Sequence, residues 1–115
     1  MSPAIKTFLS RRLKKEGYKK YDILLCIDEV ICGLGRTGNL WGSITYNLKP
    51  DIIISSKCLT AGFFPMGAVI VKSDFAEEFI DVTEQAEEFP HGFTSGGHPV
   101  GCAIALKSID VITNE

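Results

Sequence analysis

The chain has 115 residues, of which 45% are hydrophobic and 23% charged, and these values are typical of a folded globular domain rather than a disordered segment. No hydrophobic run in the sequence has the length that spans a bilayer, and the net charge of −2 divides into +6 over residues 1–20 and −8 over residues 21–115. The acidic main body argues against a nucleic-acid partner, because it would repel a phosphate backbone. Four cysteines without a paired spacing, and only two histidines, argue against a zinc site and favour a reducing, cytoplasmic location.

The first segment, residues 1–20, is predicted to be an amphipathic basic helix. Four apolar residues share one helical face, opposite a row of lysines and arginines: Ile5, Phe8, Leu9 and Leu13. Pro3 suits the first helical position, and Gly17 can end the helix. Two interpretations stay open, a surface helix that covers a sheet, which we prefer, and an organelle-targeting or membrane-surface helix.

The rest of the chain alternates expected strands and helices. The apolar run Ile23–Ile27 predicts a buried parallel strand that Asp28 and Glu29 terminate. Two further strands and two helices are expected at Ile52–Ser55, Ala68–Val71, Phe75–Val82 and from Pro99 to about Ile112. Strands that alternate with helices predict an α/β fold with a mostly parallel sheet flanked by helices.

Two short motifs resemble nucleotide-binding signatures but lack the context that those sites need. Residues 33–38 fit G-x-G-x-x-G, yet four residues separate them from Asp28 and the next stretch is a poor helix former, so we expect no dinucleotide site. Residues 24–29 resemble the apolar strand and Asp-Glu pair of nucleotide hydrolases. No G-x-x-x-x-G-K-[ST] loop accompanies them, which argues against an ATPase.

Lys57 is the first candidate for chemistry. It follows an expected strand, and open α/β sheets place their ligands at the carboxyl ends of their strands. Burial at such a site would disfavour the charged ammonium and leave a nucleophilic amine that can form a Schiff base with an aldehyde. Position alone favours the simpler interpretation, a solvated loop lysine.

Asp28 and Thr94 turn the balance toward a cofactor site. Asp28 ends another expected strand, so a carboxylate and an amine can reach one edge of the sheet. Pyridoxal phosphate (PLP) requires this pair, because a lysine holds its aldehyde and an acid keeps its pyridine nitrogen protonated. Thr94 precedes Ser-Gly-Gly and a helix start, and its hydroxyl and the free backbone N–H groups suit a phosphate.

Three blocks of the sequence resemble consecutive blocks of the class III PLP-dependent aminotransferases, closest to the omega-amino-acid:pyruvate type. They are YDILLCIDEVICGLGRTGNLWG, KPDIIISSKCLTAGFFPMGAVIV and HGFTSGGHPVGCAIALKSIDVI, and together they cover residues 21–112. The resemblance implies a fold-type I transferase. It also implies that residues 21–115 are part of the PLP-binding large domain, without its N-terminal part and without the C-terminal small domain.

The resemblance also implies a role for each site residue. Lys57 would form the Schiff base and then act as the base in a 1,3-proton shift, while Asp28 would pair with the pyridine nitrogen. Val30 would pack against one face of the ring. Thr94 would bind the phosphate of the neighbouring subunit's cofactor, which implies a homodimer with a shared active site. The reaction would transfer an amino group from an amine or omega-amino acid to a keto acid such as pyruvate. His91 and His98 receive no chemical role.

The chain also departs from the family pattern. Ile27, Leu34 and Cys58 replace a smaller residue, a phenylalanine and a glycine that are common there, and we expect all three to be tolerated. The phosphate-cradling loop, the second ring-stacking aromatic and the substrate-binding arginine are missing, so we expect the isolated chain to be incomplete and inactive. Two alternatives follow, a non-catalytic truncated remnant or interaction module, and a PLP aminomutase or racemase of the same fold.

Overall fold

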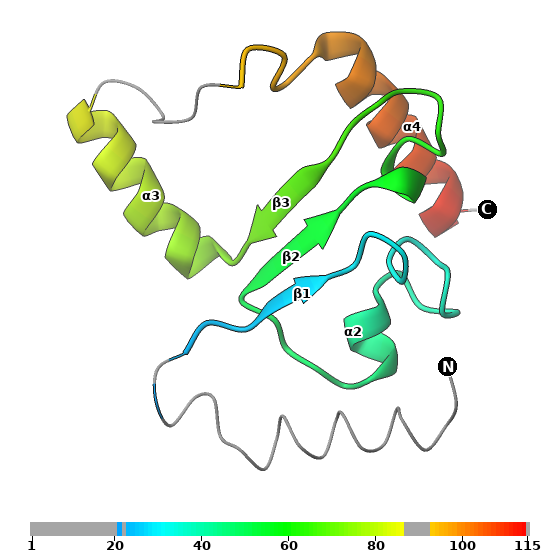
Figure 1. The fold of residues 1–115 in the computed structure, drawn as a ribbon, viewed down its shortest axis with the longest axis horizontal. Coiled ribbons are helices and arrows are strands. Elements are labelled where there is room, and N and C mark those ends of the chain that lie inside the picture. Colours follow the sequence, from blue (N-terminus) through cyan, green and yellow to red (C-terminus); the bar gives the residue numbers. More distant parts are fainter. Residues whose placement is uncertain (1–20, 22, 87–92, 115) are drawn as a thin grey trace.

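A computed structural model describes residues 21, 23–86 and 93–114 of the chain. The predicted basic helix over residues 1–20 lies outside these described residues. The elements follow in the order β1 (Cys26–Asp28), α2 (Gly42–Thr45), β2 (Ile52–Ser55), the 3₁₀ turn η2 (Lys57–Leu59), β3 (Ala68–Val71), α3 (Ser73–Ala86) and α4 (Pro99–Asn114) (Figure 1).

The three strands form one mixed sheet in the order β1-β2-β3. β1 and β2 are parallel, with Asp28 opposite Ile54, whereas β2 and β3 are antiparallel, with Ile54 opposite Val69. The predicted α/β class is confirmed, but these strands do not form the mostly parallel sheet that we expected. The reason is the connection from β2 to β3, which holds only the short turn η2 and no crossover helix, so the chain reverses direction.

The second and third predicted strands coincide with β2 and β3 residue for residue. Three consecutive isoleucines and a valine-rich run favour extended backbone there. Both predicted helices are also present and are longer than expected. α3 extends beyond the predicted Phe75–Val82 at both ends, and α4 begins at Pro99, as predicted, and ends at Asn114.

The first strand differs from the prediction in extent and in burial. Only Cys26–Asp28 pairs with β2, and Ile23 and Leu24 are exposed by 59% and 50%. The strand begins late because the N–H of Leu25 donates to the Asp51 carboxylate, at 2.8 Å, instead of a ladder carbonyl. At its other end the strand includes Asp28 as its last residue, whereas the prediction ended the strand at Ile27.

The small hydrophobic core lies beyond the carboxyl ends of β1 and β2. Its buried residues come from the loop after β1, from η2 and from α4, and they are Leu34, Leu59 and Ala105. α4 approaches closely at Gly101, where an added Cβ would lie 2.8 Å from a ring carbon of Phe64. This packing fixes the segment that follows β2, in which the candidate lysine lies.

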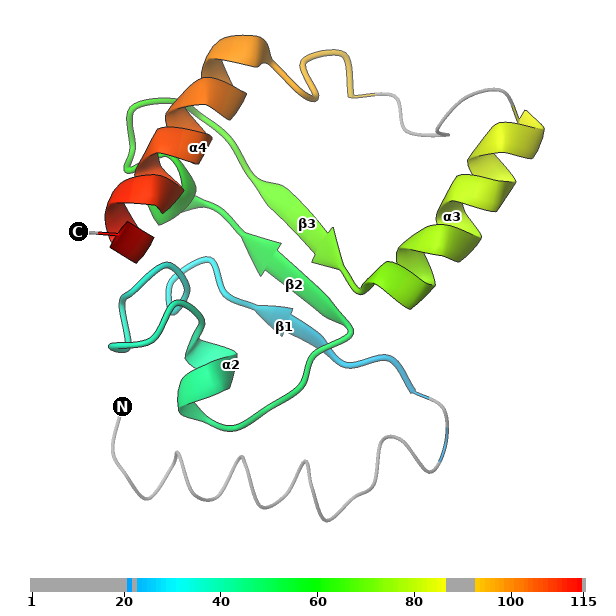
Figure 2. The same ribbon diagram turned by 180° about the vertical axis from the view of Figure 1, so that it is seen from behind.

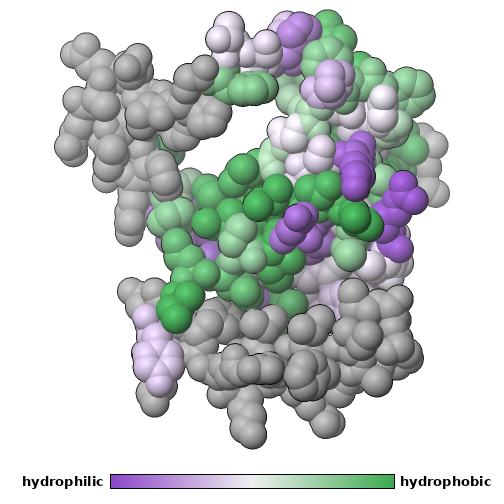
Figure 3. Space-filling model, viewed as in Figure 1, coloured by the Kyte–Doolittle hydropathy of each residue, from purple (hydrophilic) through white to green (hydrophobic). Residues whose placement is uncertain are grey.

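The sheet itself keeps exposed hydrophobic residues. Ile54, Val69 and Ile70 are exposed by 37%, 68% and 41%. The two long helices lie beyond opposite ends of β3 (Figures 1 and 2), and hydrophobic residues gather at the centre of the face that Figure 3 shows. Within the described ranges, no helix combines the length and the apolar character that crossing a membrane requires.

Candidate active site

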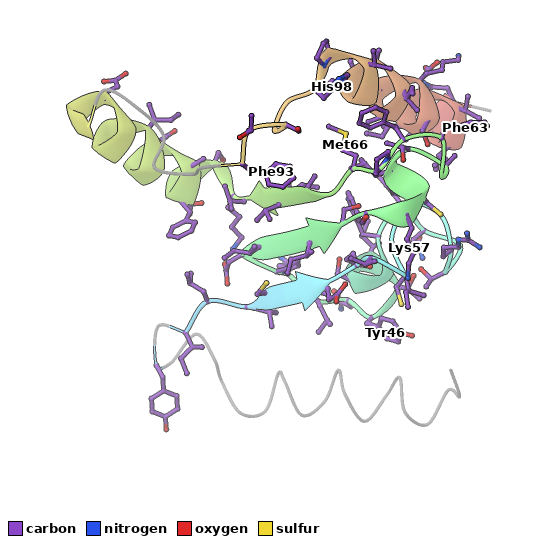
Figure 4. The ribbon with its side chains drawn as sticks, turned by 45° about the horizontal axis from the view of Figure 1, so that its top comes forward. Tyr46, Lys57, Phe63, Met66, Phe93 and His98 are labelled. Atoms are coloured by element: carbon purple, nitrogen blue, oxygen red, sulfur yellow. The ribbon has the colours of Figure 1, made fainter. Side chains whose placement is uncertain are left out.

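The parallel pairing of β1 and β2 brings two predicted site residues to one edge of the sheet. Asp28 is the last residue of β1 and lies opposite Ile54, and Lys57 follows Ile54 by three residues as the first residue of η2. Figure 4 shows Lys57 just beyond the ends of these two strands. The backbone therefore places both residues at the carboxyl ends of neighbouring strands, as the sequence predicted.

The polar groups of this pair are available to a ligand. The Asp28 Oδ1 atom accepts a hydrogen bond from the Val30 N–H at 2.9 Å. Within the described part of the chain, neither the Asp28 Oδ2 atom nor the Lys57 amine has a hydrogen-bond or ion-pair partner. One carboxylate oxygen and one amine, both without partners among the described residues, therefore lie at this edge, and these two groups suit the two ends of PLP.

One part of the lysine prediction was wrong. The sequence argument had assumed that Lys57 is buried, whereas the lysine is exposed in this structure. The residues that η2 contributes to the interior are Leu59 and the neighbouring Thr60, both of which are buried, and Lys57 stays outside their packing.

The other two predicted cofactor residues lie in different parts of the structure. Val30 is half-buried in the turn after β1 and shares the edge with Asp28. Thr94 is exposed in the turn before α4, and that turn lies beyond β3, on the far side of the sheet from β1 (Figures 1 and 2). The structure thus brings Asp28, Val30 and Lys57 together and leaves Thr94 apart.

The structure also shows what surrounds His98 and the G-x-G-x-x-G stretch. The His98 ring packs against Phe64 with ring centroids 4.9 Å apart, which agrees with a packing role, and His91 lies outside the described residues. After the G-x-G-x-x-G stretch the next helix is α2, which has only four residues and begins at Gly42. The glycines are thus not followed directly by a long helix, and this agrees with the expectation from the sequence that the next stretch is a poor helix former.

Glu29 is a residue whose importance the sequence did not indicate. It is only 1% exposed, and its carboxylate accepts the N–H of Gly42 at 2.9 Å and that of Ser43 at 2.6 Å. A Cβ on Gly42 would lie 2.8 Å from the same carboxylate. Glu29 therefore ties the loop after β1 to α2, directly beside Asp28.

This region also contains an apolar pocket. An apolar pocket of about 640 Å³ lies between α4 and the segment after β2, and Cys58, Phe63 and Ser108 are among its lining residues. Lys57 does not line it. In residues 21, 23–86 and 93–114, no three or more His, Cys, Asp or Glu side chains cluster in a way that could hold a metal ion.

Comparison with protein families decides the relationship. The family model for class III aminotransferases matches residues 4–115, which is nearly the whole chain. The chain belongs to the class III aminotransferase family. Members of this family use PLP, and two of the related crystal structures are described as PLP-bound and PMP-bound aminotransferases.

Individual relatives agree with this membership. The chain is 48% identical over 101 residues to a putrescine–pyruvate aminotransferase from Pseudomonas aeruginosa, covering 88% of this chain and 21% of the relative. An omega-aminotransferase structure from Paracoccus denitrificans is 66% identical with a TM-score of 0.78, over 84% of this chain and 22% of that one. The PLP-bound mutant aminotransferase from Vibrio fluvialis is 59% identical with a TM-score of 0.81, over 90% of this chain and 23% of that one.

These matches are extensive for this chain and partial for its relatives. The chain spans about a fifth of the length of the curated relatives that it matches. At these identities the structural likeness extends to family as well as fold, and it supports a fold-type I origin for the α/β unit.

Proposed function

We propose that this chain forms part of a PLP-dependent aminotransferase that transfers an amino group from an amine or omega-amino acid to a keto acid such as pyruvate. The observation that carries the proposal is that Asp28 and Lys57 lie at one edge of the sheet. Among the described residues, neither the Asp28 Oδ2 atom nor the Lys57 amine has another partner. The putrescine–pyruvate and omega-aminotransferase relatives support the choice of donor and acceptor classes.

Each residue at this edge has a defined task in the proposal. When bound, PLP supplies an electron-accepting ring that stabilises negative charge on the substrate carbon. Lys57 would hold the cofactor through its aldehyde group, with water as the leaving group, and its amine would carry the proton during the transfer. The Asp28 carboxylate would keep a proton on the pyridine nitrogen, and Val30 would pack against one ring face.

Thr94 takes part from a second subunit in this proposal. The turn that contains it lies beyond β3 (Figures 1 and 2), away from the edge that holds Asp28 and Lys57, so a contact with a phosphate at its own subunit's edge is not favoured. A homodimer with a shared active site accommodates this separation, because Thr94 of one protomer can then bind the phosphate in the other. Isolated protomers would then bind the cofactor less tightly than the dimer.

We also propose that the chain alone does not turn over substrate. It spans about a fifth of its curated relatives, and in this structure the candidate lysine and several hydrophobic residues of the sheet are exposed. Turnover requires a site from which water is excluded, and the described residues do not enclose one around Lys57.

The four free cysteines support a reducing compartment such as the cytoplasm.

The test uses substitutions that separate the two site residues. With PLP and borohydride, Lys57→Ala is expected to lose the covalent cofactor adduct, whereas Asp28→Asn is expected to keep it. In the assembled enzyme Asp28→Asn is then expected to lose turnover, because an amide does not hold the pyridine proton. Lys49→Ala, which removes another exposed lysine, is the matched control and should trap cofactor like the wild type.

Two alternatives predict different results in the same assays. A PLP aminomutase or racemase would also form the Lys57 adduct, but it would convert an amino acid to an isomer without using a keto acid. Product analysis with pyruvate as acceptor distinguishes them, because only transamination yields alanine and a new carbonyl compound. A non-catalytic remnant or interaction module, which the open sheet favours, would form no specific adduct on Lys57 even when folded.

A further inference from the structure

Lys57 has an unusual backbone conformation for a lysine. Its φ angle is +47°, in the left-handed region that residues other than glycine rarely adopt. Such a conformation persists only where surrounding contacts determine it, and it is often found at functional sites. The contacts that hold this turn are therefore of interest for the position of the lysine.

The hydrogen bonds within the turn do not by themselves connect it to the rest of the fold. The N–H of Leu59 donates to the Ser56 carbonyl at 3.0 Å, and the N–H of Thr60 donates to the Lys57 carbonyl at 3.4 Å. These bonds close the turn locally. They leave its placement relative to β1, and hence to Asp28, to longer-range contacts.

Two longer-range contacts converge on Cys58, the residue after the lysine. The Ser108 hydroxyl of α4 donates to the Cys58 carbonyl at 2.9 Å across 50 residues of sequence. The Arg36 Nε–H, from the loop after β1, donates to the Cys58 sulfur at 3.1 Å. Cys58 is therefore held by α4 on one side and by the loop that follows Asp28 on the other.

The hydrogen bond from Ser108 is the stronger of these two contacts. It is partly buried, whereas the bond from Arg36 is exposed and ends on sulfur, a weak acceptor. Ser108 also lies one turn from Ala105, which is buried in the core, and α4 is seated closely at Gly101. The hydroxyl thus projects from a helix whose own position is fixed by packing.

We propose that Ser108 is a positioning residue for Lys57, acting through the carbonyl of Cys58. Its hydrogen bond holds the left-handed turn and so fixes the backbone from which the Lys57 side chain extends, relative to Asp28. The inference rests on the proposed role of Lys57 as the cofactor-binding amine. Its structural part, the hold on the turn, is independent of the cofactor.

Two measurements on the full chain test this inference. The first is hydrogen exchange at the amides of Leu59 and Thr60, and the second is the rate of borohydride-trapped PLP addition to Lys57. Loss of one neutral hydrogen bond changes the equilibrium between the closed and the open turn by about fivefold. Ser108→Ala is therefore expected to speed amide exchange, and to slow PLP trapping, by about this factor. Ser108→Thr, which restores a hydroxyl, is expected to return both rates to wild-type values.

Thr113→Ala is the matched control. The Thr113 hydroxyl also donates to a backbone carbonyl, that of Ile109 at 2.9 Å, but within α4 and away from the turn. This variant is expected to match the wild type in both measurements. If Ser108→Ala does not fold, Ser108→Cys replaces it in the test, because a thiol has a similar volume and is only a weak donor. Its exchange and trapping rates are expected to lie between those of the wild type and those expected when the hydrogen bond is lost.

Several results would overturn the inference. These are wild-type exchange and trapping rates in Ser108→Ala, a failure of Ser108→Thr to restore them, or an equal acceleration of exchange at core amides such as Ala105. The last result would mean that Ser108 stabilises the whole fold rather than the turn. If the wild-type chain shows no Lys57 adduct while Ser108→Ala still loosens the turn selectively, the proposed cofactor role fails and the structural hold stands.

Discussion

Replacing Glu29 by glutamine removes a buried charge without changing the size of the side chain. The carboxylate is 1% exposed and accepts the N–H groups of Gly42 and Ser43 at 2.9 and 2.6 Å. Glutamine keeps one acceptor oxygen and places an NH₂ group against the other N–H, so one charge-assisted bond is lost. Such bonds contribute about 1.5–3 kcal/mol each, and we expect Glu29→Gln to lower the free energy of unfolding by about 2 kcal/mol.

The assay is urea unfolding followed by circular dichroism, with a thermal scan beside it. For a domain of this size a loss of about 2 kcal/mol corresponds to a Tm lower by about 8 °C. Glu77→Gln, at an exposed position of α3, is the matched control and should change the unfolding free energy by less than about 0.5 kcal/mol. A Glu29→Gln chain as stable as this control would refute the reasoning, since the carboxylate would then not hold the loop to α2.

Further predictions concern packing and charge. Gly33→Ala should lower the free energy of unfolding by about 1–3 kcal/mol, because its Cβ would lie 2.8 Å from the Glu29 backbone oxygen; Gly67→Ala, whose nearest neighbour is at 3.4 Å, should be close to neutral in the same urea assay. Hydrogen bonds from Lys107 and Asn114 hold the pKa of the Asp110 carboxyl below its ordinary value of 3.8, which an NMR titration would measure. Any stability from this group is therefore present above the ordinary value and is lost as the pH falls through the folded-state pKa, and a wild-type titration midpoint at or above 3.8 would contradict this.

Much of the strand pattern could be predicted because local sequence determines it. β2 and β3 were predicted residue for residue, since β-branched runs there are bounded by Pro50-Asp51, Ser56-Lys57 and Lys72-Ser73, which disfavour continuation. Strand direction is not a local property. The reversal between β2 and β3 depends on how residues 56–67 fold against α4, and no periodicity in those residues reveals it.

The site shows the same division between local and long-range information. A carboxylate and a lysine at strand ends predicted the shared edge of Asp28 and Lys57, because parallel neighbours end together. The exposure of Lys57 and the contacts of Glu29 and Ser108 could not be predicted in this way. Those contacts join residues 13 to 50 positions apart, so they exist only once the tertiary packing does.

The most direct test of the proposed chemistry is to map where PLP bonds to the chain. The purified chain, shown to be folded by circular dichroism, would be titrated with PLP while its visible spectrum is followed, then reduced with borohydride, digested and analysed by mass spectrometry. The proposal predicts a saturable spectral change and a label on Lys57 that is absent from Lys57→Ala. A label on other lysines that persists unchanged in Lys57→Ala would contradict the assignment of Lys57 as the cofactor-binding amine.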